Sequence, residues 1–85
     1  MKLTNEEIQK IRDIRIPSIL GINDMGRRIS VRCPFHRERT ASCYIYSDNS
    51  FHCFGCNTNG QGAIDFVMAL GFTFQESLSE LIKYI

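Results

Sequence analysis

The chain has 85 residues, which is enough for one small domain. The hydrophobic core of such a domain gives only marginal stability unless a disulfide or a bound metal ion adds to it. No stretch approaches the length of apolar sequence that a membrane-spanning helix needs. The formal net charge of +1 is too small to indicate a nucleic-acid-binding protein, so such a function must rest on a local patch of charge.

Residues 1–26 are expected to form a helical arm, the first part of a single domain over residues 1–85. Thr4-Asn5-Glu6-Glu7 is a capping box, in which a Thr N-cap is followed by Glu three residues later. Isoleucines then recur at helical spacing and predict a helix over residues 4–13. Pro17 ends this helix or opens a second short turn, and residues 21–26 form a bend. We interpret the arm as a packing element, with a partner-binding helix as the alternative.

Residues 27–56 are expected to form a sheet of at least three strands. Residues 27–33 alternate between apolar and polar side chains, and residues 42–46 and 50–53 are rich in strand-forming residues with turn residues between them. The alternation turns cysteines and aliphatic residues inward, and Phe35, Phe51 and Phe54 are expected to join this core. It places on the outer face Arg28, Arg32, Tyr44, Tyr46 and His52.

Residues 57–85 are expected to form a loop and two helices. The N-T-N-G-Q-G segment, residues 57–62, predicts a loop. A helix over residues 63–70 then has a buried stripe of Ile64, Val67 and Met68 with Phe66 at its edge, and Gly71 ends it. A second capping box, Thr73 to Glu76, opens the last helix. That helix carries on one face Leu78, Leu81, Ile82 and Ile85.

Four residues in two closely spaced pairs predict a metal site: Cys33, His36, Cys53 and Cys56. Each pair is separated by two residues, so a tight turn can aim both donors at one point, and two such turns give the tetrahedral set that Zn2+ favours. Three thiolates and one imidazole close the coordination sphere, which indicates one structural zinc rather than a catalytic one. The sequence therefore predicts an α+β fold, a small zinc ribbon of three or more short antiparallel strands braced by N-terminal and C-terminal helices.

Two disulfides, Cys53–Cys56 and Cys33–Cys43, are the alternative use of the cysteines. This alternative needs an exported protein, and the first residues contain no apolar run of signal-peptide length. It also leaves His36 at ligand spacing by chance. Zinc in a reducing cytoplasm is the interpretation that we prefer.

A locally basic centre indicates a phosphate-binding patch. Five arginines and a single acid, Glu38, lie between residues 27 and 39, and Arg37 and Arg39 flank the first pair of metal ligands. Basic groups can follow phosphates while aromatic rings stack on bases, so the outer sheet face is a candidate surface for single-stranded nucleic acid. The alternatives are a solvated arginine face and tyrosines that are present for their strand propensity alone. Asp65 and Glu76 belong to helix patterns, and no arrangement of residues indicates catalysis.

Three segments of the chain resemble the N-terminal zinc-binding domain of bacterial DnaG-type DNA primases: C-P-F-H-R-E-R-T-A-S, F-H-C-F-G-C and G-A-I-D-F-V-M. The resemblance runs from about residue 8 to the end of the chain. It implies a zinc ribbon braced by helices, with zinc bound by the four residues named above. It also implies a role in holding single-stranded template DNA where an RNA primer starts.

The chain departs from this family at three places. The family has T-P-S-F where this chain has T-A-S-C, so Cys43 replaces a core Phe and is expected to pack inward as a small thiol. Gly62 stands where the family tends to have Asp or Asn, which leaves DNA contacts there open. The chain ends at Ile85 without the clustered carboxylates of a primase catalytic core, so we expect no enzymatic activity of its own.

The sequence thus predicts a zinc-dependent module that binds single-stranded DNA during replication initiation and primer synthesis. It would supply template recognition to a separate polymerase, primase core or helicase, and its brevity favours a plasmid, phage or other mobile element as the source. A protein-interaction zinc ribbon that docks on or regulates the replication machinery is the main alternative. A redox switch, in which oxidation of Cys43 or of the ligands releases zinc, is a third.

Overall fold

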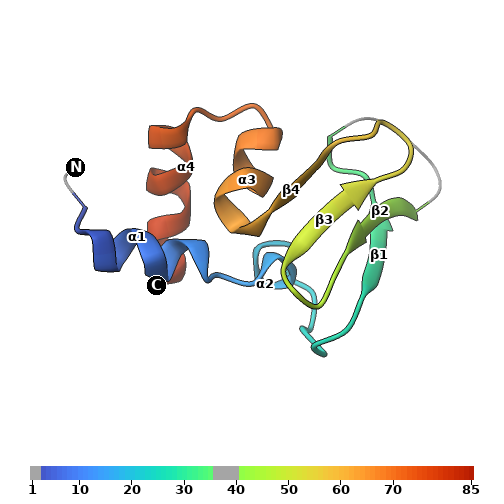
Figure 1. The fold of residues 1–85 in the computed structure, drawn as a ribbon, viewed down its shortest axis with the longest axis horizontal. Coiled ribbons are helices and arrows are strands. Elements are labelled where there is room, and N and C mark those ends of the chain that lie inside the picture. The colour runs from blue at the N-terminus through green and yellow to red at the C-terminus, as the bar shows by residue number, and fades with distance from the viewer. Residues whose placement is uncertain (1–2, 36–40) are drawn as a thin grey trace.

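The computed structural model describes residues 3–35 and 41–85. Four short strands form one antiparallel sheet in the order β1-β2-β3-β4, with bounds Ile29–Arg32, Ala41–Ile45, Ser50–Cys53 and Asn59–Gln61. The helices are α1 (Asn5–Arg12), α2 (Ile16–Ile19), α3 (Gly62–Ala69), α4 (Phe74–Leu81) and the 3-10 helix η1 (Ile82–Tyr84). Helices α1, α3 and α4 pack together at one end of the molecule and the sheet forms the other end (Figure 1). The predicted α+β class is therefore confirmed.

The strands divide their side chains between two faces as the alternation predicts. Cross-strand pairing sets Cys43 opposite Cys53 and Ile45 opposite Phe51, and all four side chains are buried. The intervening pair, Tyr44 and His52, lies on the other face and is half-buried. This register gives the sheet an inner face for the core and an aromatic outer face.

The segment expected to be a loop, residues 57–62, contains a fourth strand. Strand β4 pairs with β3 and sets Gly60 opposite Phe51. A Cβ atom added to Gly60 would lie 2.8 Å from the Phe51 ring, so only glycine lets the β4 backbone lie against that ring. The next glycine, Gly62, has φ +83°, a left-handed conformation in which the chain turns directly from β4 into α3. Of the glycines that predicted a loop, Gly60 therefore lies in a strand and Gly62 lies at the turn from that strand into α3.

Both capping boxes are present. The Thr4 hydroxyl accepts the backbone N–H of Glu7 at 3.1 Å, and the Thr73 hydroxyl accepts that of Glu76 at 3.2 Å. In each box the glutamate side chain accepts the N–H of the capping threonine in return. These contacts fix the first residues of α1 and α4.

Helix α3 joins the two halves of the core. Its Ile64 and Val67 pack with Ile11 of α1 and Leu81 of α4, while Phe66 packs into a second cluster with buried residues of the sheet and of α2. Phe66 is fully buried, with its ring centroid 5.2 Å from that of Phe51, whereas Met68 is 40% exposed. The predicted stripe was therefore wrong at both positions, because α3 buries a side toward the sheet as well as a side toward the helices.

Asn49, in the turn between β2 and β3, ties the arm to the sheet. Its side-chain amide donates to the Ile14 carbonyl at 2.8 Å and accepts the Ile16 N–H at 2.9 Å. Its own carbonyl accepts the Gly62 N–H at 2.9 Å, at the start of α3. The residue is buried and has φ +71°, a left-handed conformation that asparagine tolerates better than most residues. One residue thus holds three segments together, the arm through its side chain and the start of α3 through its backbone carbonyl.

Candidate metal centre and nucleic-acid interface

Three cysteine thiols converge at one end of the sheet. Cys33 directly follows β1, Cys53 ends β3, and Cys56 lies in the turn after β3. Their Sγ atoms all lie within 4.8 Å of one another, and those of Cys33 and Cys56 are 3.6 Å apart. Zn–S bonds of about 2.3 Å in a tetrahedron place two sulfurs about 3.8 Å apart. The spacing of the thiols therefore suits a zinc ion.

The fourth predicted ligand, His36, lies outside the described residues, as do Arg37 and Arg39. The assignment of His36 stays a prediction. The neighbouring Phe35 is described, and its backbone N–H donates to Cys33 Sγ at 3.4 Å. A donated N–H of this kind stabilises a thiolate ligand and fixes its direction.

Hydrogen bonds also surround the other two sulfurs. Cys53 Sγ lies 3.4 Å from the Ser42 hydroxyl, and Cys56 Sγ lies 3.2 Å from the Thr58 hydroxyl. Burial raises the pKa of the Cys53 thiol, but hydrogen bonds from the Ser42 hydroxyl and from the backbone N–H groups of Cys56 and Gly55 outweigh it and lower the pKa to about 6. Cys53 is therefore poised to be a thiolate near neutral pH, the form that binds a metal.

The cysteines do not form the disulfides of the alternative interpretation. Cys43 is fully buried on the inner face of the sheet and is not one of the three converging thiols. The prediction that it packs inward as a small core residue is confirmed. Its neighbours in the core include Val31 and Phe35, so the thiol packs among apolar side chains.

The outer sheet face gathers aromatic rings and a cation. The Arg28 guanidinium lies 5.2 Å from the centroid of the Tyr44 ring, and the Tyr44 ring packs edge-to-face on Phe54 with centroids 5.5 Å apart. The His52 ring, on β3, also lies close to the Phe54 ring, with centroids 4.4 Å apart. An open cleft of about 420 Å³ lies on this face and is lined by Arg28, Ser42, Tyr44, Tyr46 and Phe54.

The structure thus brings four of the predicted outer-face residues to one surface and adds Phe54. Arg32 is exposed beyond a register shift between β1 and β2, and it does not line the cleft. The prediction of Phe54 as a core residue was wrong, because its side chain is 65% exposed. Strand alternation contained the signal, because Phe54 directly follows the inward-pointing Cys53 and so falls on the same side of the sheet as His52.

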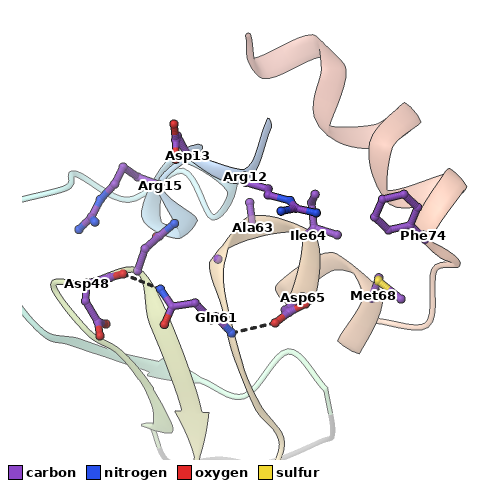
Figure 2. A pocket seen from close by; sticks show the side chains of 12 residues that line it. Arg12, Asp13, Arg15, Asp48, Gln61, Ala63, Ile64, Asp65, Met68 and Phe74 are labelled. Carbon is purple, nitrogen blue, oxygen red and sulfur yellow. Dashed lines mark hydrogen bonds between the residues drawn. The ribbon is translucent and has the colours of Figure 1, made fainter. Parts of the chain in front are cut away.

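A larger cleft, of about 590 Å³, lies at the opposite end of the sheet where α1, α3 and the β2–β3 turn meet (Figure 2). The Gln61 side chain crosses it to the Asp48 carbonyl at 2.8 Å, and the Gln61 N–H donates to the Asp65 carboxylate at 3.0 Å. None of the predicted site residues that the structure describes lines this cleft. Asp65 and Glu76 both serve the first turns of helices, as their sequence patterns indicate.

An antiparallel sheet with thiols converging at one end and helices packed at the other defines a small zinc-ribbon domain. The chain belongs to the CHC2 zinc finger family, the zinc ribbon of DnaG primases, which matches residues 3–85. The family comparison confirms the resemblance found in the sequence. None of the described helices is long and apolar enough to cross a membrane.

Curated relatives carry the name DNA primase. The chain is 42% identical over 82 residues to one from Buchnera aphidicola (subsp. Baizongia pistaciae), covering 93% of this chain. It is 33% identical over 88 residues to one from Halalkalibacterium halodurans, covering 96% of this chain, and 35% identical over 81 residues to one from Escherichia coli K12, covering 93%. The chain spans only 14%, 15% and 13% of the length of these three relatives.

Proposed function

We propose that the chain is a primase-type zinc-binding module that binds single-stranded template DNA during primer synthesis and replication initiation, in the cytoplasm and without catalytic activity of its own. One structural zinc ion is held by Cys33, His36, Cys53 and Cys56. The observation that carries the proposal is the outer sheet face, where Arg28 and the rings of Tyr44, His52 and Phe54 lie together.

Each part of this surface has a task in binding an unpaired strand. Arg28 and Arg32 are exposed and form no ion pair with any described residue, so both are available to phosphates, together with Arg37 and Arg39. The rings of Tyr44, Tyr46 and His52 offer stacking surfaces to bases. Bases are exposed for stacking in a single strand and hidden in a duplex, so the surface favours single-stranded DNA. Zinc, when bound, supplies the cross-link that fixes the ends of β1 and β3.

A titration of zinc-loaded protein with labelled single-stranded DNA, beside a duplex of matched sequence, tests the proposal. We expect binding that prefers the single strand and weakens linearly with log salt, with a slope of about −3 if all four arginines contact phosphate. Arg32→Ala is expected to reduce the slope by about 0.7. Lys83→Ala is the matched control, because it removes one positive charge on η1, where Lys83 pairs with Glu80. Absence of binding at low salt, with zinc present, would refute the proposal.

A second function is favoured by apolar side chains exposed between α3 and α4 and at the end of the chain, which include Leu70, Phe72, Tyr84 and Ile85. In this alternative the domain docks on, or regulates, a polymerase core or helicase of the replication machinery. The two functions separate by mutation. Arg32→Ala with Arg39→Ala is expected to weaken DNA binding and leave docking intact if the first function is right. Phe72→Ala is expected to abolish docking and leave DNA binding intact if the second holds.

A further inference from the structure

Phe54 is the most exposed aromatic side chain of the described residues, at 65%. We propose that Phe54, with Tyr44 and Arg28, forms a slot that holds one unpaired nucleobase of the bound strand. The inference rests on the proposed function and goes beyond it, because it assigns base contact to a residue on the metal-binding turn itself. An exposed ring of this size is costly to hydrate, and a planar ligand that covers it regains that free energy.

The geometry of the slot suits a flat aromatic ligand. Phe54 stands at 77° to the Tyr44 ring and at 57° to the His52 ring, so its neighbours contact it without covering it. Arg28 lies over Tyr44 on the same face, where a planar guanidinium can stack on a base or pair with the adjoining phosphate. The cleft that these residues line has a volume of about 420 Å³, within the range of small-ligand sites.

Phe54 is held in place by the backbone around the thiols. It lies between Cys53 and Cys56, two of the three converging cysteines. Its N–H donates to the Ser42 carbonyl at 2.9 Å, and the Asn57 N–H donates to the Cys53 carbonyl at 2.7 Å, which closes the turn. A ring held by such a turn loses little conformational freedom when a ligand binds, so more of the stacking free energy appears as affinity.

Charge favours a base of a nucleic acid over an apolar side chain of a protein. None of the described residues that line the cleft is acidic, and Arg28 makes no ion pair with a described residue. A ligand that brings a negative charge next to a planar ring therefore matches the site. A nucleotide has both, whereas an apolar peptide side chain would leave the guanidinium without an anionic partner.

The test uses the zinc-loaded full chain and two oligonucleotides of equal length, one normal and one abasic. The chain contains no tryptophan, so Phe54→Trp supplies a single fluorescent reporter in the slot. We expect its emission to be quenched by the normal strand and not by the abasic strand. Phe54→Ala is expected to weaken binding of the normal strand by about 5- to 150-fold, the effect of one lost base stack, and to leave binding of the abasic strand unchanged.

Two controls keep the outcome decisive. Tyr84→Ala removes an aromatic ring of the helical end and is expected to bind as the wild type does. Zinc content is measured for every variant. If Phe54→Ala binds zinc poorly, Phe54→Leu takes its place, because leucine keeps apolar volume at this position and removes only the aromatic ring. If the wild type binds both strands equally, or if Phe54→Leu binds the normal strand as tightly as the wild type, the slot is refuted while DNA binding through phosphates stands. If neither strand binds, both proposals fail.

Discussion

Replacing Asn49 by alanine removes the contacts that hold the helical arm on the sheet. The side-chain amide of Asn49 forms hydrogen bonds with two backbone groups, the Ile14 carbonyl and the Ile16 N–H. Without the amide, both groups would be buried without these partners. Ile16 is fully buried and Ile14 nearly so. Alanine at this position must also keep φ +71°, which a residue other than glycine or asparagine adopts only at a cost.

The magnitude follows from these contacts. Two buried backbone groups left without partners cost about 1–3 kcal/mol each, and the left-handed conformation of alanine adds about 1 kcal/mol. The expected loss of unfolding free energy is therefore about 3–7 kcal/mol. A domain of this size has a total stability of about 4–13 kcal/mol, so this single substitution is expected to leave the fold marginal.

Urea unfolding of the zinc-loaded protein, at a fixed free-zinc concentration, measures this loss. Asn49→Gly removes the same hydrogen bonds without the backbone cost and is expected to be about 1 kcal/mol more stable than Asn49→Ala. Asn57→Ala is the matched control, because Asn57 also has a left-handed backbone (φ 64°) but is exposed. A loss below about 1 kcal/mol for Asn49→Ala would show that water replaces the amide and would refute the reasoning.

Three further predictions concern the sheet. Because hydrogen bonds lower the pKa of Cys53 to about 6, protons compete with zinc for this thiolate only below that pH. A chromophoric chelator should therefore detect no zinc release as the pH falls from 8 to 6, and substantial release at pH 7 would contradict this. Gly60→Ala is expected to lower the free energy of unfolding, measured in urea, by about 1–3 kcal/mol, because the added methyl group overpacks the Phe51 ring. In the double variant, Phe51→Leu is expected to recover part of that loss, and strictly additive effects of the two changes would contradict the contact. Chelation of zinc is expected to speed hydrogen exchange first in the sheet, since the helical core cluster contains no cysteine, and equal acceleration in α4 would count against this order.

Local rules in the sequence were enough for the parts of the fold that depend on nearest neighbours. A threonine with a glutamate three residues later predicts a capping box because both partners of each hydrogen bond lie in one turn, and both boxes are present. Alternation in the strands predicts which side chains share a face, and Tyr44 and His52 lie together as expected. The two-residue spacing of Cys53 and Cys56 brings their thiols together by the same local logic, whereas pairing of the strands brings Cys33 to them.

Features that depend on contacts between distant segments were not predictable from local patterns. Gly60 belongs to a strand because the Phe51 ring lies against its backbone, a fact that a turn-rich composition conceals. Phe66 rather than Met68 is buried because α3 faces both the sheet and the helices. Asn49 looks like an ordinary turn residue until its partners, more than thirty positions away, are known.

The alternation of the strands also explains how a structural metal can govern a binding surface. Cys43 and Cys53 point inward, and the residues next to them in sequence, Tyr44 and His52, point outward at directly opposed positions. The Ser42 hydroxyl contacts Cys53 Sγ, and the Ser42 carbonyl receives the N–H of Phe54. The sulfur cluster and the aromatic face are therefore one residue apart along β3, where Cys53 lies between His52 and Phe54. Because the same short backbone segments carry both, the thiols cannot be displaced without moving the rings.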